Sequence, residues 1–516
     1  MTAPQSPVGL RGRAPILFVV IVAIAGGLIA GRSHSPRAAR PVAPVDAVQR
    51  SNLGALSTAW YCPGLPRSFR THDQTVTLSN VGATDAQAAI TVHPDGGGDP
   101  IVRRVTVPGN DVRSFDRGSF LETTRAALAT TGTATTTTTA PTTKKRTAGG
   151  LPGGAVVVEP FSPDIVVSAG VETDTALDSV PCATTAGKHW YFAAGETVRG
   201  VKQWLVIEDP FSADARVDVT LRTDVGLKEL PNLQGIDVPG RSRVVIPIHE
   251  QAVRQPRVAI EVHAVVGEVV ASQTLEYGPA AGTPGIATTL GTLAPATRWW
   301  FTDGAALEGA SQWVAVTDMG PIQAHFVVQA FTGLTTILNP VVSQVDSGGV
   351  VWVQIGNCPR GDVTCLAVPA GAPYELTVQS DGNVPIVAQT LSRFRARKVA
   401  VGATTAMGST VPARRWVIAR TRAAAERSTE ISVMNPGVSD AHITVEIVHD
   451  GVVDRPDDLQ HLTIAHNAFL VLPAETGGAT HQHDAAVVIT ADAPVLAAST
   501  IYAARDATRP PGIPTR

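Results

Sequence analysis

Residues 207–221 read IEDPFSADARVDVTL, an apolar strand end followed by a turn and a second strand. The turn opens at Asp209, and an Asp or Asn at that place can bond its own backbone and tolerate the dihedral angles of a tight reversal. Beyond the turn, apolar residues alternate strictly with polar residues as far as Leu221. A period of two with one polar face is typical of an antiparallel sheet that is packed on one side. The stretch therefore predicts two strands joined by a tight turn.

The same pattern occurs four times along the chain. LSNVGATDAQAAITV from Leu78, VTDMGPIQAHFVVQA from Val316 and VMNPGVSDAHITVEI from Val433 align with it without a gap. Each copy has an Asn or Asp at the turn and an alanine in register in the second strand. The turn residues are Asn80, Asp209, Asp318 and Asn435, and the alanines are Ala86, Ala215, Ala324 and Ala441.

An aromatic signature precedes each copy and gives a second marker. KHWYF ends at Phe192, and TAWYC, TRWWF and RRWVI end at Cys62, Phe301 and Ile418. The residues of the signature are Trp60, Tyr61, Trp190, Tyr191, Phe192, Trp299, Trp300, Phe301 and Trp416. The intervals between the signatures keep step with the intervals between the turns, and two independent markers in step indicate internal duplication.

Two roles for the signature stay open at this point. Its side chains are large enough to bury ~150 to 250 Å² each, at one end of a domain or at the seam with the next domain. Alternatively, they form a row of platforms that stack on sugar rings. Trp299 and Trp300 are adjacent in a strand and point to opposite faces, so one of them could be exposed. The fourth copy has aliphatic residues after Trp416, which favours packing.

Length and composition indicate an all-β protein of several domains. The chain has 516 residues, more than a single hydrophobic core supports. Its 47 glycines and 38 prolines, with abundant Val and Thr, favour short strands and turns. Six or seven strands in each copy match the pattern of a sandwich. The fold class expected is four tandem Ig-like antiparallel β-sandwich repeats, preceded by one N-terminal transmembrane helix.

The N-terminus supplies the evidence for that helix. Residues 14–31 carry no charge and are flanked by arginines, which describes a minimal membrane span or a long secretory signal. Either interpretation exports the rest of the chain. A Thr-rich insert at 127–154 has too little hydrophobicity to order a core. The predicted domains are a cytoplasmic N-terminus 1–13, the anchor or signal 14–31, a Pro/Ala-rich tether 32–57, repeat 1 at 58–183 with its disordered insert, repeat 2 at 184–280, repeat 3 at 281–397, repeat 4 at 398–505 and a disordered tail 506–516.

The four cysteines fit an extracytoplasmic setting if they form disulfides. Cys358 and Cys365 enclose a short loop. Cys62 and Cys182 would bracket the first repeat, and closing so long a loop is worth ~4 to 5 kcal/mol by chain entropy. Three pairings are open to four cysteines, so this one is a hypothesis. A zinc site is the rival interpretation, but the cysteine and histidine spacings do not match it.

Four segments, HWYFAAGET, VIEDP, VPGRSRVVI and GEVVASQTLEY, follow a repeat pattern that opens with W-Y-F-A-x-G. Through them the chain resembles a family of secreted or membrane-anchored actinobacterial proteins built of repeated β domains of unknown function. Residues that match are Trp190, Tyr191, Phe192, Ala193, Gly195, Pro239, Ser242 and Arg243. Asp209 departs from the Asn that is usual in the family, and Ser272 and Gln273 replace a Glu-Arg pair. The resemblance implies a structural unit and no known activity.

Motifs for chemistry are few. His481, His483 and Asp484 could contribute to a divalent metal site, although no spacing fixes a fourth ligand. The usual nucleophile, metalloprotease and phosphate-loop motifs do not occur. We therefore predict no catalytic, metal or cofactor-binding residues. A net charge of -3 with 16% charged residues also gives no footprint for nucleic acid.

The expected function is a non-catalytic scaffold of the cell envelope. The chain would be held in the cell membrane by a single N-terminal helix, with its C-terminal bulk outside, or secreted if that segment is cleaved. Its partner would be a cell-wall polymer or a membrane protein. The alternative is a carbohydrate-binding protein or an unrecognised carbohydrate-active enzyme. Exposed tryptophans in a common groove would favour the alternative, whereas buried signatures would favour the scaffold.

Overall fold

The computed structural model describes most of the chain after residue 58. The described residues are 59–66, 74–95, 99–116, 154–172, 177–305, 309–333, 336–356, 358–359, 361–396, 400–421, 427–474, 484–503 and 506–515. The chain divides into two compact units, Met1–Pro44 and Val45–Arg516, and every described residue belongs to the second. The predicted anchor, the tether and residues 127–153 of the predicted insert lie outside the described residues. Within the described part, no helix combines the length and the apolar character needed to cross a bilayer.

The described chain is all-β, and its sheets follow the four repeats. Repeat 1 contains β1 (Trp60–Cys62), β2 (Gln74–Asn80), β3 (Ala86–Pro94), β4 (Ile101–Val107), β5 (Asp111–Asp116), β6 (Gly154–Pro160), β7 (Ile165–Glu172) and β8 (Leu177–Pro181). They form two sheets, in the orders β1-β6-β3-β4 and β5-β2-β7-β8.

Repeat 2 adds short helical turns to the same plan. Its elements are β9 (His189–Phe192), β10 (Val201–Asp209), β11 (Ala215–Thr223), β12 (Gly226–Lys228), η1 (Pro231–Leu233), β13 (Ile236–Val238), β14 (Ser242–Pro247), α3 (Ile248–Gln251), β15 (Val258–Val266), β16 (Val270–Tyr277), η2 (Pro279–Ala281) and β17 (Gly285–Leu290). The sheets run β14-β10-β16-β17 and β12-β11-β15-β9, with β13 also paired to β11.

Repeats 3 and 4 also consist of two sheets each. Repeat 3 contains β18 (Arg298–Ala305), β19 (Ser311–Asp318), β20 (Ala324–Thr332), β21 (Thr336–Ile337), β22 (Val341–Val345), β23 (Val350–Gly356), β24 (Cys365–Ala367), β25 (Pro373–Ser380), β26 (Ile386–Ala396) and β27 (Ala400–Met407). Repeat 4 contains β28 (Ala413–Thr421), β29 (Arg427–Asn435), β30 (Ala441–His449), β31 (Val452–Asp454), η3 (Asp457–Leu459), β32 (Leu462–Ile464), β33 (Ala468–Pro473), β34 (Ala485–Ala503), β35 (Asp506–Thr508) and β36 (Ile513–Thr515). The long strand β34 takes part in both sheets of repeat 4.

The hydrophobic alternation in β11 produces the packing that the sequence predicts. Its apolar side chains Ala215, Val217, Val219 and Leu221 are at most 1% exposed. They join side chains of β10 and β16, in the facing sheet, in one core. The turn at Asp209 therefore carries the chain from one sheet of the repeat to the other. The backbone N–H of Phe211 donates to the Asp209 carboxylate at 2.9 Å.

The same turn geometry recurs in the other three copies. In each, the side-chain oxygen of the turn residue accepts a hydrogen bond from the backbone N–H two positions later, at 2.7 to 3.1 Å. The acceptors are Asn80, Asp318 and Asn435, and the donors are Gly82, Gly320 and Gly437. This is the local bond that favours Asn and Asp in tight turns. The four alanines in register are at most 6% exposed.

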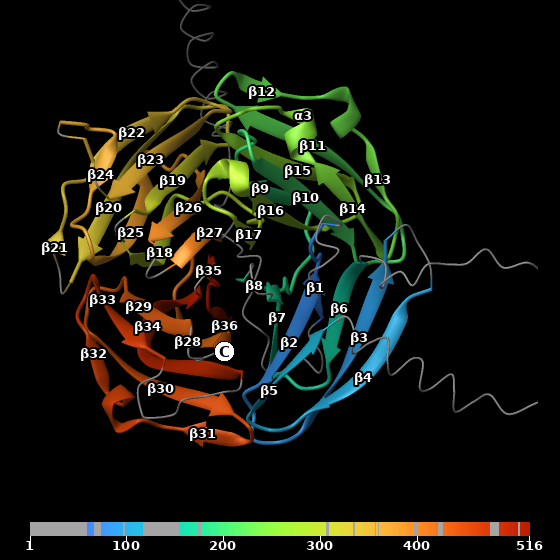
Figure 1. The fold of residues 1–516 in the computed structure, drawn as a ribbon, viewed down its shortest axis with the longest axis vertical. Coiled ribbons are helices and arrows are strands. Elements are labelled where there is room, and N and C mark those ends of the chain that lie inside the picture. The colour runs from blue at the N-terminus through green and yellow to red at the C-terminus, as the bar shows by residue number, and fades with distance from the viewer. Residues whose placement is uncertain are drawn as a thin grey trace, which may run out of the picture. The chain divides into compact units, whose positions relative to one another are not determined.

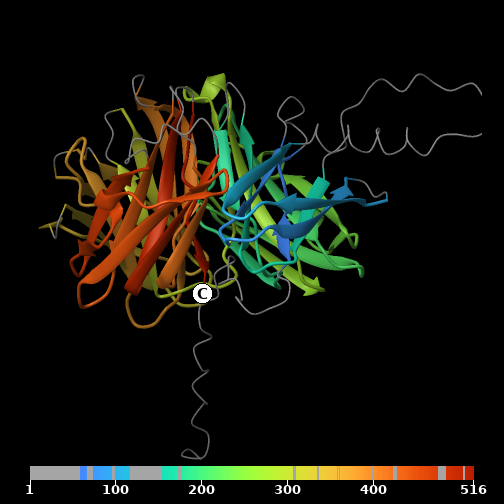
Figure 2. The same ribbon diagram turned by 90° about the horizontal axis from the view of Figure 1, so that it is seen from below.

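Within Val45–Arg516 the four repeats close into a ring, because strands of repeat 4 contact strands of repeat 1. Figure 1 shows β30 and β31 of repeat 4 beside β5 of repeat 1, and in Figure 2 the orange strands of repeat 4 again lie beside the blue strands of repeat 1. The backbone N–H of Gly451 donates to the carbonyl of Asn110 at 2.9 Å, and the hydroxyl of Ser114 donates to Asp484 at 2.7 Å. The spacing of the repeats in the sequence fits both a closed ring and a linear array of repeats. The contacts between repeat 4 and repeat 1 show that the ring is closed.

Two of the predicted boundaries need correction. The sequence places repeat limits after residues 280 and 397, but β17 and β27 lie beyond these limits and pair with β16 and β26 of the preceding repeat. The prediction of a disordered tail at 506–516 is wrong, because β35 pairs with β34 and β36 pairs with β28. These segments contain Gly, Pro and Thr and lack a strict alternation of apolar and polar residues. Their sequences therefore resemble those of loops that connect repeats. The strands, with the isolated bridges at Ala183, Thr292 and Ser409, assign residues 60–183, 189–292, 298–409 and 413–515 to the four repeats.

Candidate functional site

The first tryptophan of each signature is a core residue of its own repeat. Trp60, Trp190 and Trp299 are 0% exposed, and Trp416 is 3% exposed. Each belongs to the hydrophobic core of the repeat that contains it. The indole N–H of Trp190 donates to the carbonyl of Val269 at 2.7 Å. These rings are therefore not available as platforms for sugar.

The next residue of each signature packs against the following repeat. Tyr61 packs on the core of repeat 2, Tyr191 lies in the core cluster of repeat 3, and Trp300 packs on the core of repeat 4. Val417, in the corresponding position of repeat 4, lies in the core cluster of repeat 1. Adjacent residues of a strand point to opposite faces, so one strand fills its own core and also joins its neighbour. The signature thus holds the ring together.

In repeats 2 and 3 the segment that leads to the next repeat hydrogen-bonds to the signature strand. The backbone N–H of Tyr191 donates to Thr292 at 2.9 Å, and that of Trp300 donates to Ser409 at 2.9 Å. The glycine just before each of these acceptors lies against an aromatic ring, Gly291 against Phe192 and Gly408 against Phe301. A Cβ at either glycine would come within 2.8 Å of the ring. A side chain larger than hydrogen would therefore displace the ring.

Repeat 1 has a disulfide in place of this contact between ring and glycine. Cys62 occupies the position of Phe192, and Cys182 that of Gly291, and the two are joined. The backbone N–H of Tyr61 donates to Ala183 at 2.7 Å, as in the other repeats. The second disulfide joins Cys358 and Cys365, and both pairs are those that the sequence suggests.

A buried ion pair joins repeat 1 to repeat 2. Arg243 donates from Nε and Nη2 to the two carboxylate oxygens of Asp95, at 2.6 and 3.1 Å, and from Nη1 to the carbonyl of Pro63 at 2.5 Å. The side chains of Arg243 and Asp95 are 1% and 5% exposed. Glu208 is fully buried beside them, and burial raises its pKa to about 8 against the opposing effect of Arg243. The sequence singles out Arg243 only as part of a resemblance, since its partner lies in another repeat.

Four strands, one from each repeat, meet at the centre of the ring. They are β8, β17, β27 and β35, and each contacts at least two of the others. Asp506 accepts from the backbone N–H of Leu177 at 3.0 Å, and Asp178 accepts from the hydroxyl of Thr508 at 3.1 Å. Burial raises the pKa of Asp178 to about 7 and that of Asp506 well above its usual value. Two nearly inaccessible carboxyl groups thus lie where repeats 1 and 4 meet.

A small apolar hollow of about 100 Å³ lies beside the central strands. All four repeats contribute to its lining, among them Val180, Leu290, Trp300, Met407 and Trp416. Trp300, one of the two adjacent tryptophans of which the sequence allows one to be exposed, is half-buried here, with the guanidinium of Arg298 at 5.7 Å from its ring.

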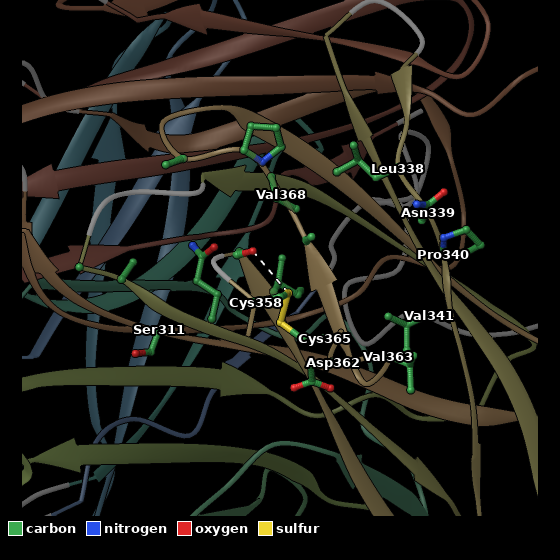
Figure 3. A pocket seen from close by; sticks show the side chains of 18 of the residues that line it. Ser311, Leu338, Asn339, Pro340, Val341, Cys358, Asp362, Val363, Cys365 and Val368 are labelled. Carbon is green, nitrogen blue, oxygen red and sulfur yellow. Dashed lines mark hydrogen bonds between the residues drawn. A yellow bond between two sulfur atoms is a disulfide. The ribbon is translucent and has the colours of Figure 1, made fainter. Parts of the chain in front are cut away.

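A large hollow lies at one end of repeat 3, with a volume of about 1300 Å³ (Figure 3). Its rim includes the loop closed by Cys358 and Cys365, and its wall includes Gln312, Arg393 and Arg395. Tyr374 donates from its hydroxyl to the amide oxygen of Gln312 at 2.5 Å, which fixes that side chain. Hydrophobic patterning does not reveal this hollow, because its cause is a missing element.

The missing element is a short helical turn that closes the same end of repeats 2 and 4. In repeat 2, Leu233 of η1 and Ile248 of α3 are at most 2% exposed and belong to the core. In repeat 4, Leu459 of η3 is 3% exposed. In repeat 3, only Leu338, Asn339 and Pro340 separate β21 from β22, and the disulfide loop follows β23 in place of α3. Among the residues that the structure describes, no helical turn covers this end of the third core.

Histidines do not assemble a metal site in the described part of the chain, where no three metal-binding side chains lie together. His189 and His263 stack at 4.5 Å between ring centroids. Burial and the neighbouring His263 lower the pKa of His189. His481 and His483 lie outside the described residues, so the alternative of a metal site with Asp484 is not tested, and Asp484 itself pairs with Arg420 at 3.2 Å.

Comparisons with known proteins give a family and no activity. No curated protein matches the sequence. A solved structure described as "Crystal structure of tetra-tandem repeat in extending region of large adhesion protein" is 10% identical, over 84% of this chain and 97% of that chain, with a TM-score of 0.10. The model of the "Family of unknown function (DUF5719)" matches residues 129–394, which is more than half of the chain. The chain therefore belongs to the DUF5719 family.

Proposed function

We propose that this protein is a non-catalytic scaffold of the cell envelope, built of four tandem Ig-like β-sandwich repeats behind one N-terminal transmembrane helix at residues 14–31. In this proposal the ring lies outside the membrane and holds a cell-wall polymer or a membrane protein. The W-Y-F-A-x-G repeat and an actinobacterial source belong to the same proposal.

The burial of the aromatic signature is the observation that carries the proposal. All four leading tryptophans are at most 3% exposed, and the residues that follow them join neighbouring repeats. The residues of the aromatic signature thus build the contacts of the ring, and the four leading tryptophans are not accessible to a ligand. A closed ring with fixed contacts between repeats presents its loops in a constant arrangement, which is the property required of a scaffold.

Two further observations support the proposal. Two disulfides suit an oxidising compartment outside the cytoplasm. Among the described residues that line the large hollow, Asp362 is the one carboxylate, whereas hydrolysis of a glycosidic bond ordinarily uses two. This favours the scaffold over the alternative, a carbohydrate-active enzyme.

Export can be tested with a C-terminal alkaline phosphatase fusion, which is active only outside the cytoplasm. We expect activity from the native chain and loss of activity when Val20 and Ile24 are replaced by arginine, because two charges prevent membrane insertion. The matched control replaces both residues by leucine and should keep the activity. Equal activity from the arginine and leucine variants would rule out residues 14–31 as the exporting segment.

The partner can be tested by capturing envelope fractions on the full chain, with and without soluble arabinan or galactan as competitors. The scaffold proposal expects a cell-wall polymer or a membrane protein to be retained, and no hydrolysis of either sugar. Capture that the free sugars abolish would instead favour a carbohydrate-binding protein. Release of sugar fragments by the protein would contradict the non-catalytic proposal.

A further inference from the structure

The last two strands of repeat 4, β35 and β36, lie in the middle of the ring (Figure 1). Residues 506–515 contain both strands and form a strap across this centre. All residues of the strap except Pro511 are buried. In the strap, β35 contacts β8, β17 and β27 of the first three repeats, and β36 pairs with β28 of the fourth. One short segment thus touches all four sandwiches.

The carboxyl group of Asp506 lies at the point where the repeats meet. Its Oδ2 accepts hydrogen bonds from the backbone N–H groups of Leu177 in repeat 1, at 3.0 Å, and Ile286 in repeat 2, at 3.4 Å. Two glycines leave room for this group. A Cβ at Gly285 would lie 3.0 Å from Asp506 Oδ1, and a Cβ at Gly402 would overlap that oxygen.

These two glycines and Asp506 occupy equivalent positions in repeats 2, 3 and 4. Each lies six residues before a glycine that packs against an aromatic ring of its own repeat. Those later glycines are Gly291, Gly408 and Gly512. Repeats 2 and 3 therefore lack a side chain at the position where repeat 4 has a carboxyl group, and repeat 4 fills the space that they leave.

The strap is not part of the hydrophobic core of its own repeat. None of the described residues in the core of repeat 4 comes from residues 506–515. Ala507 packs instead with Phe394 of repeat 3 and Tyr502 of repeat 4, and Ile513 lies in the core of repeat 1. The buried aliphatic side chains of the strap therefore stabilise joints between repeats.

The joint between repeats 4 and 1 is formed without a connecting segment, because these repeats are not consecutive in the chain. The strap supplies hydrogen bonds across it. The hydroxyl of Thr508 donates to Asp178 and accepts from the backbone N–H of Ser179, both at 3.1 Å. Asp506 forms no ion pair with any described residue, so hydrogen bonds hold its carboxyl group at the centre.

We propose that residues 506–515 are a detachable strap, which closes the ring while Asp506 occupies the centre and opens the joint between repeats 4 and 1 when it leaves. The four sandwiches stay folded in both states, because the strap contributes nothing to the core of repeat 4. Local opening of this kind costs less free energy than global unfolding. The proposal does not depend on the scaffold function.

Hydrogen–deuterium exchange of the native full chain, followed by mass spectrometry of peptic fragments, tests whether the strap detaches separately. The strap should exchange faster than β29 and β30, which belong to the core of repeat 4, by roughly tenfold or more.

Gly402→Ala places a methyl group against Asp506 and should raise the exchange rate of the strap roughly tenfold. The segment around Gly451 should follow, because its N–H donates to the carbonyl of Asn110 across the joint with repeat 1 at 2.9 Å. The strands β29 and β30 should keep their native rates. The matched control is Gly278→Ala, whose added methyl group meets no atom closer than 3.4 Å and should leave all these rates unchanged.

A second variant provides the same test if Gly402→Ala fails to fold. Thr508→Val keeps the shape of the side chain and removes the hydroxyl that bonds to repeat 1. The exchange rate of the strap should rise roughly fivefold, as expected for lost hydrogen bonds. Thr106→Val, at an exposed threonine of β4, is the matched control and should exchange like the native chain.

Four results would overturn the proposal. Equal exchange rates of the strap and of β29 and β30 in the native chain would show that the strap unfolds only with its repeat. A joint rise of the strap and these two strands in either variant would show the same. Strap rates that neither variant changes would show that the centre does not hold the strap. A faster strap with an unchanged rate around Gly451 would show that the strap does not close the ring.

Discussion

Replacement of Arg243 by methionine should weaken the joint between repeats 1 and 2. The guanidinium donates three hydrogen bonds across the joint, two to Asp95 and one to the carbonyl of Pro63, and both charged side chains are at most 5% exposed. Removing one partner of a buried ion pair costs ~3 to 5 kcal/mol, because the other charge stays out of water. Methionine keeps much of the apolar stem, so the loss should come mainly from the charge and the hydrogen bonds.

The assay is urea unfolding at pH 7, followed by tryptophan fluorescence. Arg243→Lys should lose about half as much as Arg243→Met, since an ammonium group keeps the charge but cannot form the paired bonds. The double variant Arg243→Met with Asp95→Leu should regain most of the loss, because no buried charge is left. The matched control is Arg216→Met, whose ion pair with Asp237 has side chains 57% and 71% exposed and should be worth at most ~1 kcal/mol.

The reasoning fails if Arg243→Met and Arg216→Met lose equal stability. It also fails if the double variant is less stable than Arg243→Met, because the two side chains would then contribute independently. In either case the contact between the repeats would depend on apolar packing around Tyr61, and the ion pair would be incidental.

Three further predictions concern single positions. Asp209→Asn should stabilise the protein by ~1 kcal/mol at pH 8 and by less at pH 4. Burial raises the pKa of Asp209 to about 6, so ionisation of the native carboxyl lowers the stability of the protein as the pH rises from 4 to 6. Thermal unfolding at both pH values tests this. Asp178→Asn should flatten the decline in melting temperature between pH 4 and 7, because over that range the carboxyl is ionised in the unfolded chain whereas the native carboxyl, with a pKa of about 7, keeps its proton; an unchanged slope would contradict the buried position. Replacing Cys62 and Cys182 by alanine should cost ~4 to 5 kcal/mol in denaturant unfolding, whereas replacing them by Phe and Gly should recover part of the loss and make the joint insensitive to reductant.

The sequence predicts features that depend on neighbouring residues. Strict alternation in residues 215–221 is enough to define the buried face of β11, and an Asn or Asp at each turn makes the expected bond to its own backbone. The duplication is visible because the markers lie in register. It extends to the pairing of Cys62 with Cys182, which replaces the contact between Phe192 and Gly291.

Features that depend on distant residues could not be predicted. Asp506 contacts Leu177, which is 329 residues away in the sequence. No sequence pattern in either segment indicates that the two segments are in contact. The segments that form β17, β27 and β35 have compositions typical of connectors, and the neighbouring repeats are what turn them into strands. The hollow of repeat 3 lies where the described residues have no counterpart of η1 and α3 of repeat 2, a difference that appears only when the strands of the two repeats are compared.

Closure of the ring has a consequence for the evolution of this architecture. In an open stack of repeats, a unit can be gained or lost at an end with little effect on the others. Here Val417 of the last repeat lies in the core of the first repeat. Insertion of a further repeat between the two would therefore remove Val417 from that core. A relative with three or five units could not inherit these joints unchanged, because every unit would have to turn by a different angle to meet its neighbour. Selection that preserves the packing between repeats therefore also preserves the number of repeats.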